Sequence, residues 1–249
     1  MSLALGCKPT DGSRRLVVGM ELSYPPFEMT DEQGRPAGVS VDLARALSEH
    51  LGRELVIENI AFDGLIPALK TGKIDVILSS LTRTEERALS IDFSDPYLET
   101  GLCLLVSKAS PINTVADLDQ PGRKFAVKKG TTGHAYASAH LQKAEVLVLD
   151  KEAAAVLEVV QGKVDAFIYD QFSTLQHWQR NAETTRAILK PFQTEQWAMG
   201  LRKGNDDLHT SINGFLSDFR KQGGFDRLAD RWLKEQKAAF TRQNLPFVF

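Results

Sequence analysis

Short apolar runs alternate with amphipathic stretches along most of this chain. Leu16–Met20 and Leu55–Ile57 are apolar runs of the length expected for buried strands. Between them, apolar residues recur at helical spacing over Val41–Leu51, a helix that Ser40 can cap and Gly52 can end. Strands that alternate with helices in this way predict an α/β fold with a mostly parallel sheet and helices on its faces.

An internal echo repeats a helix end, a glycine and a strand. Gly72–Leu78 reads Gly-Lys-Ile-Asp-Val-Ile-Leu, Gly162–Ile168 reads Gly-Lys-Val-Asp-Ala-Phe-Ile, and each follows an amphipathic helix. Polar residues come after both strands, with Ser79 and Ser80 after the first and Asp170 after the second. In open α/β sheets, ligands sit beyond the carboxyl ends of the strands. The echo therefore predicts two similar lobes that face one cleft.

The C-terminal part carries further periodic segments. Trp197–Arg202 is predicted as a strand, and Leu208–Gln222 and Phe225–Phe240 are predicted as amphipathic helices. The last residues, Leu245–Phe249, are apolar for a chain end. We expect this segment to dock on the body of the protein, and contact with a partner is the alternative.

Composition removes several classes of function. The chain has 249 residues with a net charge of −2, and its acidic and basic residues are mixed along the whole length. Because no basic stripe is present, a nucleic-acid partner is not expected. No apolar run approaches the ~18 residues of a membrane span. His-Glu-x-x-His, Gly-x-Ser-x-Gly and phosphate-loop motifs are absent from the sequence, so we predict no metal, no cofactor and no catalytic residue.

The first residues, 1–14, are predicted to be an N-terminal tail. They have neither a positive start nor a long apolar core, so they do not form an intact signal peptide. Small residues precede Cys7, as they do where lipoproteins are cleaved and acylated. Cys7 is therefore a candidate lipid-anchor site, and an ordinary cysteine is the alternative.

A hydroxyl-rich stretch follows the first echo strand and leads into a helix. Thr82 and Thr84 are alternative caps of this helix, and its free backbone N–H groups favour an anion. Arg87 lies in the first turn, where the helix dipole disfavours a cation. That position is understandable if Arg87 faces a carboxylate. The alternative is an exposed arginine paired with Glu86 or Asp92.

A second stretch of the same kind is Lys129–Gly133, with Thr131 and Thr132 at its centre. It lies between a predicted strand, Phe125–Val127, and a predicted helix, His134–Leu141. Strand, glycine, hydroxyls and helix N-terminus together form a cradle for a small anion. An ordinary helix cap is the alternative.

Asp170 is the counterpart of Arg87 in this arrangement. It follows an apolar strand, so it should be partly desolvated and should need a partner. With Arg87 across the cleft, the two residues would recognise both ends of a zwitterion. Tyr24, Phe27 and Phe62 could enclose the aliphatic part of such a ligand, although each could equally be a core residue.

Together these segments resemble the polar amino-acid-binding proteins of bacterial ABC importers, solute-binding family 3. The resemblance runs from about Leu16 to Lys234 and rests on six motifs in the order of the family: Tyr24–Glu28, Phe62–Leu69, Ser79–Thr82 with Arg87, Asp92–Tyr97, Gly130–Thr132 and Asp170. It implies a two-lobe periplasmic-binding-protein fold (type II), with two hinge strands near Gly101–Leu105 and Met199–Arg202. Residues 15–101 with 200–249 would form lobe 1, and residues 102–199 would form lobe 2.

The same resemblance implies a role for most of the candidate residues. Arg87, Thr82 and Thr132 would bind the α-carboxylate of the ligand, and Asp170 and Ser80 would bind its α-ammonium. The remaining members of the predicted site are Tyr24 and Phe62, which would flank the side chain, with Ser79 and Thr131 beside them.

Two further positions bear on the ligand side chain. Glu21 stands where many members of the family have aspartate, and Lys128 stands where glutamine binders have a lysine. Glu21 alone favours a cationic side chain such as that of lysine or arginine. Glu21 together with Lys128 favours an amide such as that of glutamine, and the sequence leaves both readings open.

The resemblance implies an extracytoplasmic, monomeric binding protein that delivers a small polar L-amino acid to the membrane permease of an ABC importer. A ligand-sensing domain of a receptor or histidine kinase is one alternative. An enzyme similar to cyclohexadienyl dehydratase is the other. That reaction needs a general acid in place of the ammonium-binding aspartate, and the presence of Asp170 argues against it.

Overall fold

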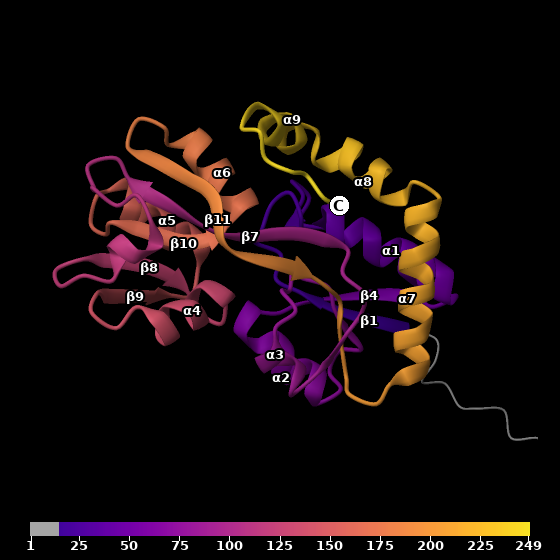
Figure 1. The fold of residues 1–249 in the computed structure, drawn as a ribbon. Helices are drawn as coiled ribbons and strands as arrows, with labels where there is room; N and C mark the ends of the chain where they lie inside the picture. Colours follow the sequence, from indigo (N-terminus) through magenta and orange to yellow (C-terminus); the bar gives the residue numbers. More distant parts are fainter. Residues whose placement is uncertain (1–14) are drawn as a thin grey trace, which may run out of the picture.

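The computed structural model describes residues 15–249, so the predicted tail with Cys7 lies outside the described residues. The chain forms two lobes, each built on one five-stranded sheet. Two long antiparallel strands, β7 (Leu98–Ser107) and β11 (Thr185–Trp197), run along the middle of the molecule from one lobe to the other (Figure 1). The predicted two-lobe α/β fold is confirmed.

The sheet of the first lobe has the spatial order β4-β1-β5-β12-β6. Its strands are β4 (Glu54–Asn59), β1 (Arg15–Met20), β5 (Val76–Ile77), β12 (Gly200–Leu201) and β6 (Asp92–Phe93). The sheet of the second lobe has the order β11-β7-β10-β8-β9 and adds β10 (Ala166–Asp170), β8 (Lys124–Lys128) and β9 (Glu145–Leu149). A small hairpin consists of β2 (Met29–Thr30) and β3 (Pro36–Ala37).

Both sheets are mixed, whereas the sequence predicted mostly parallel ones. In the first lobe, β1 pairs in parallel with β4 and β5, and β12 pairs antiparallel with β5 and β6. In the second lobe, β8 pairs in parallel with β9 and β10, and β7 pairs antiparallel with β10 and β11. The alternation of helices and strands predicts only the parallel pairs. The antiparallel pairs involve β7 and β11, which pass between the lobes, and β12, which follows β11.

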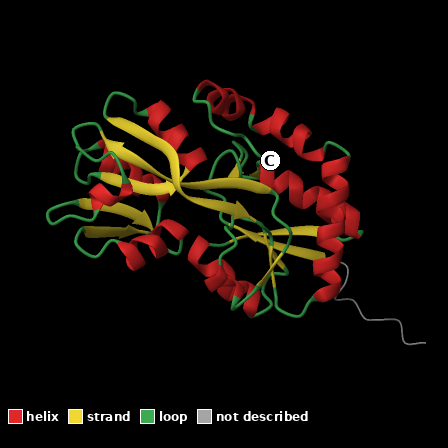
Figure 2. Ribbon diagram, viewed as in Figure 1, coloured by secondary structure: helices red, strands yellow, loops and turns green. Residues whose placement is uncertain are grey.

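Helices cover the outer faces of both sheets (Figure 2). They are α1 (Val39–Leu51), η1 (Phe62–Gly64), α2 (Leu65–Lys70), α3 (Glu85–Ala88), η2 (Val115–Leu118), α4 (Thr132–His140), α5 (Glu152–Val160), α6 (Gln171–Arg180), α7 (Asp206–Lys221), α8 (Gly224–Trp232) and α9 (Lys234–Arg242). One face of the first sheet packs against α1, α7 and α8, and the opposite face packs against α2. In the second lobe, α4 and α5 cover opposite faces.

The internal echo has a structural explanation in its two aspartates. The Asp75 carboxylate accepts a hydrogen bond from the backbone N–H of Val17, at 3.0 Å. The Asp165 carboxylate accepts one from the N–H of Lys124, also at 3.0 Å. Each aspartate therefore fixes the beginning of the neighbouring parallel strand, β1 in one lobe and β8 in the other. The repeated motif joins a helix end to a sheet in the same way twice.

The second hinge strand is not where the resemblance placed it. The predicted strand Trp197–Arg202 is interrupted, and β12, which lies inside Met199–Arg202, belongs to the first sheet between β5 and β6. The second crossing strand is β11, which precedes it. Its burial is irregular and its register shifts between Ile188 and Gln193, so no clean apolar alternation marks it in the sequence. The first predicted hinge, Gly101–Leu105, lies within β7.

Two local predictions were wrong. Helix α1 begins at Val39 with Gly38 before it and has no side-chain cap, because the Ser40 hydroxyl donates to Glu28 at 3.0 Å instead. The predicted helix Phe225–Phe240 is two helices, α8 and α9, which join at the buried Leu233.

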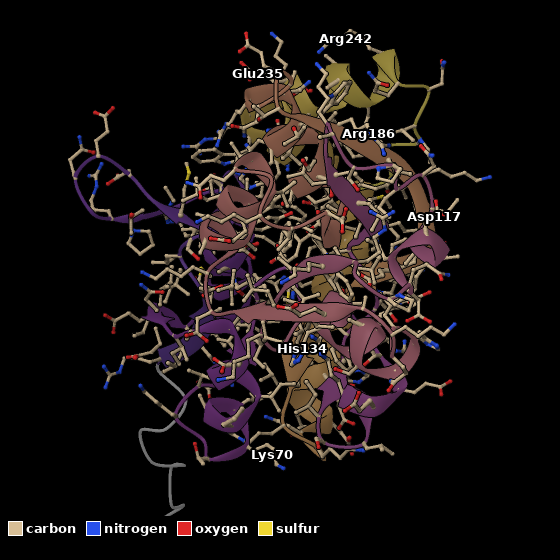
Figure 3. All side chains as sticks on the ribbon, turned by 90° about the vertical axis from the view of Figure 1, so that its left-hand side faces the viewer. Lys70, Asp117, His134, Arg186, Glu235 and Arg242 are labelled. Carbon is tan, nitrogen blue, oxygen red and sulfur yellow. The ribbon has the colours of Figure 1, made fainter. Side chains whose placement is uncertain are left out.

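The apolar C-terminal segment docks on the body, as the sequence predicted. Leu245, Phe247 and Phe249 pack against the core of the first lobe, and the N–H of Glu99 donates to the carbonyl of Val248 at 3.1 Å. Seen from the side of the second lobe, Glu235 and Arg242 of α9 lie at one end of the molecule and Lys70 lies at the other (Figure 3). Within residues 15–249, no helix is long and apolar enough to cross a membrane.

Candidate functional site

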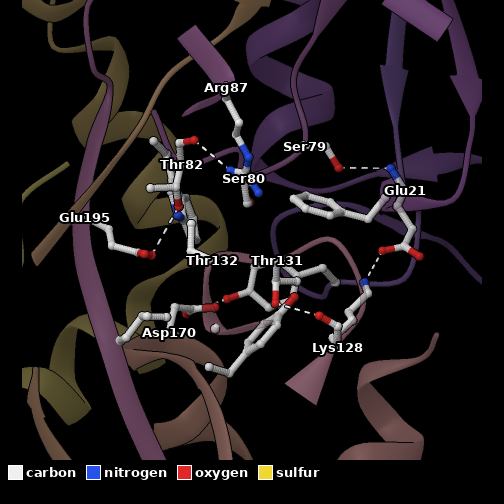
Figure 4. A pocket seen from close by; sticks show the side chains of 16 residues that line it. Glu21, Ser79, Ser80, Thr82, Arg87, Lys128, Thr131, Thr132, Asp170 and Glu195 are labelled. Carbon is white, nitrogen blue, oxygen red and sulfur yellow. Dashed lines mark hydrogen bonds and ion pairs between the residues drawn. The ribbon is translucent and has the colours of Figure 1, made fainter. Parts of the chain in front are cut away.

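A pocket lies between the lobes, beside the paired strands β7 and β11 (Figure 4). It contains about 490 Å³ of space free of protein atoms, part of it open to solvent. Every site residue that the sequence predicted borders this one pocket: Glu21, Tyr24, Phe62, Ser79, Ser80, Thr82, Arg87, Lys128, Thr131, Thr132 and Asp170.

Arg87 enters the pocket from the first lobe. Thr84 is the N-cap of α3, since its hydroxyl accepts from the N–H of Arg87 at 3.1 Å, so the cap at Thr82 is not used. The Arg87 guanidinium donates through Nη1 to the carbonyl of Thr82 at 2.7 Å. Through Nη2 it donates across the cleft to the carbonyl of Gly130 at 2.9 Å. Arg87 thus faces the cleft and not Glu86, and burial lowers its pKa from the ordinary value.

Asp170 enters the pocket from the second lobe, at the end of β10. Its Oδ1 accepts hydrogen bonds from the N–H groups of Phe172 and Ser173 at 2.9 and 3.1 Å, which makes it the N-cap of α6. The Tyr24 hydroxyl from the first lobe donates to the same oxygen at 2.7 Å. Burial is the main reason that the pKa of Asp170 rises to about 7.

The second threonine-rich stretch forms the N-terminus of α4. The Thr131 hydroxyl caps this helix by accepting from the N–H of His134 at 3.3 Å, and it donates to the carbonyl of Lys128 at 2.7 Å. Thr132 is the first residue of the helix and is buried beside the pocket. The structure therefore shows the ordinary helix cap, and the anion cradle at the same place stays a prediction.

Glu21 and Lys128 form an ion pair that crosses the cleft at the other end of the pocket. The Lys128 side chain is 3% exposed and the Glu21 side chain 16% exposed, so the pair is largely removed from water. The Ser79 hydroxyl holds this end by accepting from the backbone N–H of Glu21 at 3.0 Å. The centroid of the Phe62 ring lies 5.5 Å from Lys128 Nζ and 5.6 Å from the Arg87 guanidinium carbon.

Ser80 lies in front of a buried carboxyl group, that of Glu28. The Ser80 hydroxyl donates to Glu28 Oε1 at 2.9 Å, and the backbone of Ser80 adopts a positive φ of 48°. Burial raises the pKa of Glu28 to about 8, although hydrogen bonds from Ser80 and Ser40 oppose this shift. The Ser80 hydroxyl is therefore occupied by Glu28. The residue borders the pocket with its backbone in the strained left-handed region.

Several lining residues were not predicted: Leu102, Gly133, Tyr169, Glu195 and Trp197. Gly133 and Tyr169 are neighbours of Thr132 and Asp170, so their position follows from those predictions. Glu195 lies within β11, where no motif or periodicity distinguishes it. Phe27, considered for the ligand, is a core residue that is 1% exposed and stacks on Tyr24 with ring centroids 5.4 Å apart.

Comparison with known proteins places this chain in a family. The L-arginine-binding protein of Pseudomonas aeruginosa is 32% identical over 242 residues, which cover 93% of each chain. The L-cystine-binding protein TcyJ of Escherichia coli is 30% identical over 219 residues, or 87% of this chain and 82% of TcyJ. The crystal structure of AncCDT-1, described as an ancestral amino acid-binding protein and a precursor of cyclohexadienyl dehydratase, has a TM-score of 0.80 at 35% identity. It covers 88% of this chain and 95% of its own. Residues 16–235 match the family model, and the chain belongs to the bacterial extracellular solute-binding proteins, family 3.

Proposed function

We propose that this protein binds a small polar L-amino acid between its lobes and delivers it to the membrane permease of an ABC importer. One observation carries the proposal. Arg87 from the first lobe and Asp170 from the second lobe border the same pocket, and each is held by neighbouring polar groups. An α-amino acid carries opposite charges one carbon apart, and closure of the cleft removes water from both. Each ligand charge therefore needs a charged partner in the pocket.

The head group of the ligand uses one end of the pocket in this proposal. Arg87 donates to the α-carboxylate, since its planar guanidinium suits that group, and Thr82 and Thr132 lie beside it. Asp170 accepts from the α-ammonium, together with the backbone of Ser80. Tyr24 and Phe62 enclose the beginning of the side chain.

The end of the ligand side chain meets Glu21 and Lys128. Since these two residues already neutralise each other, they offer both a donor and an acceptor and favour a neutral polar side chain such as that of glutamine. The relatives named as arginine-binding proteins support a cationic side chain as the second candidate. A cation would have to take the place of Lys128 beside Glu21.

Binding without catalysis is part of the proposal. Asp170 Oδ1 accepts three hydrogen bonds, which oppose the effect of burial on its pKa, and a bound ammonium would further favour the ionised carboxylate that holds it. The relatives named above are binding proteins, although AncCDT-1 is described as a precursor of a dehydratase. We propose a monomer that acts outside the cytoplasm, with residues 15–101 and 200–249 as lobe 1 and residues 102–199 as lobe 2.

A thermal-shift screen tests the proposal with the twenty standard L-amino acids and L-cystine. A compound present at ~100 times its Kd should stabilise the folded protein by ~2.7 kcal/mol. The same screen on the Arg87→Ala variant should give no shift, which ties the effect to this pocket. If no compound raises the melting temperature of the wild-type protein, the proposed function is wrong.

A further inference from the structure

Glu195 is a buried carboxyl group at the head-group end of the pocket. It projects from β11, the residue is 4% exposed, and it borders the same pocket as Arg87. The Thr82 hydroxyl donates to its Oε2 at 3.1 Å, and the side-chain amide of Gln193 donates to its Oε1 at 3.2 Å. Thr82 is also the residue whose carbonyl accepts from Arg87. A single residue therefore joins this acid to the arginine proposed to bind the ligand carboxylate.

Among residues 15–249, the lining of the pocket has one more carboxyl group than cations. Its lining cations are Arg87 and Lys128, and its lining acids are Glu21, Asp170 and Glu195. Glu21 is paired with Lys128. A bound amino acid adds one charge of each sign, with the ammonium at Asp170 and the carboxylate at Arg87. Glu195 is then left without a cation, beside a second carboxylate.

Two carboxylates that share a desolvated site do not both remain ionised, because their mutual repulsion is not screened by water. The ligand carboxylate is held by the guanidinium of Arg87 in the proposed complex. The group that can change its charge is then Glu195. Protonation removes its repulsion and leaves the acid with an O–H group that can donate a hydrogen bond.

We propose that Glu195 takes up a proton from solvent when an amino acid binds, so that ligand affinity is linked to pH through this residue. This inference rests on the proposed function. The step is a simple association in which one carboxylate oxygen of Glu195 gains a proton and the protein gains one positive charge. Higher pH then weakens binding, by up to about tenfold per pH unit between the pKa of Glu195 in the free protein and its higher pKa in the complex.

The surroundings of Glu195 support this step. Burial raises its pKa, while the hydroxyls of Thr132 and Thr82 and the charge of Arg87 act in the opposite direction. The other ionisable groups whose charges interact with it are Asp170 at the end of β10 and Cys103 on β7. The Cys103 thiol is buried and burial raises its pKa, so it contributes no charge near neutral pH. Asp170 is the group that must be separated from Glu195 by experiment.

The sign of the proton transfer separates the two acids. Asp170 must be ionised to hold an ammonium, so a protonated fraction of Asp170 releases its proton on binding. Glu195 does the opposite in our proposal. If Glu195 instead joined Asp170 in holding the ammonium, both acids would release protons.

Isothermal titration in buffers of different ionisation enthalpy measures this proton transfer. Wild type, Glu195→Gln and Glu99→Gln are titrated with L-glutamine, L-arginine and L-cystine between pH 6 and pH 8. Glu99 is the matched control, since it is an exposed glutamate on the strand paired with β11 and its side chain accepts only from Gln196. We expect wild type and Glu99→Gln to take up more protons than Glu195→Gln, by up to one per ligand.

Each outcome decides one question. If Glu195→Gln takes up as many protons as wild type, or more, the inference is overturned. Binding that strengthens in Glu195→Gln at pH 8 and loses part of its pH dependence supports it. If none of these three and no compound of the thermal-shift screen binds wild type, the proposed function fails. Binding without a difference between wild type and Glu195→Gln contradicts this inference alone.

Discussion

The two ends of the pocket treat charge in different ways. At the head-group end, Arg87 and Asp170 come from opposite lobes and are held by hydroxyls and backbone groups, so both remain available to a ligand. At the other end, Glu21 and Lys128 also come from opposite lobes but bind each other. The first arrangement suits the α-carboxylate and α-ammonium, which every amino acid carries. The second suits the side chain, which differs from one amino acid to the next. We therefore expect affinity to depend on the first end and selectivity on the second.

The largest effect should follow from changes at the head-group end. Removal of one partner from a buried charge pair costs ~3–5 kcal/mol, much of it from the charge left unpaired. At ~1.4 kcal/mol per tenfold, Arg87→Ala and Asp170→Ala should each weaken amino-acid binding by roughly two to four orders of magnitude. Calorimetry measures both. Arg83→Ala removes an exposed arginine outside the pocket and should bind like wild type. Wild-type affinity in either pocket variant would refute the assignment.

A smaller and selective effect is expected at the paired end. Lys128→Met leaves Glu21 free for a cationic side chain, so it should raise the affinity for arginine relative to glutamine by about tenfold or more. Glu21→Gln should shift the same ratio in the opposite direction. Lys129→Met is the matched control, because Lys129 pairs with Asp63 across the cleft but does not line the pocket. Equal loss for both ligands in both pocket variants would mean that the pair is structural.

A change at a contact between the lobes should affect ligand affinity less than the changes at the head-group end. Gly130 has a φ of 76°, and a Cβ there would lie 2.9 Å from the Asp63 Cβ of the opposite lobe. Gly130→Ala should therefore weaken binding by about tenfold, or ~1.4 kcal/mol, since the clash with Asp63 arises only when the two lobes are in contact. Gly34→Ala introduces an alanine at a φ of 74° with no atom near its Cβ, so only its folding stability should suffer. Similar binding by both variants would show that Gly130 does not limit closure.

The last effect is on stability and not on binding, and it concerns Glu28, the acid behind Ser80. The pKa of Glu28 rises from 4.5 to about 8 through burial, so the folded protein holds this proton more tightly than the unfolded chain. The stabilisation is complete below pH 4.5 and is lost as the pH rises to about 8. From pH 5 to pH 8, the melting temperature of wild type should fall by at least ~2 °C more than that of Glu28→Gln. Exposed Glu32→Gln should follow wild type, and parallel curves for Glu28→Gln and wild type would contradict this prediction.

The sequence contains much of this site because its main residues stand at the ends of repeated elements. Arg87 and Asp170 each follow an echo strand, and the two threonine stretches each precede a helix, so position along the chain implies position in the cleft. Glu195 has no such mark, because it lies inside a strand whose partner is distant in sequence. The second hinge strand was misplaced for the same reason. No local sequence pattern predicts the register between β7 and β11. The sequence therefore does not show which polar residues of β11 face the pocket.

The position of β12 has a consequence for the order in which the protein can form. This strand lies between β5 and β6, yet the ribosome adds it only after the whole second sheet has been made. The second sheet comes from one uninterrupted stretch of chain and can pair fully while synthesis continues. In the first sheet, the place between β5 and β6 stays empty until Gly200 and Leu201 of β12 have been synthesised. The first lobe therefore completes its sheet only after the second lobe is made, from the two ends of the chain.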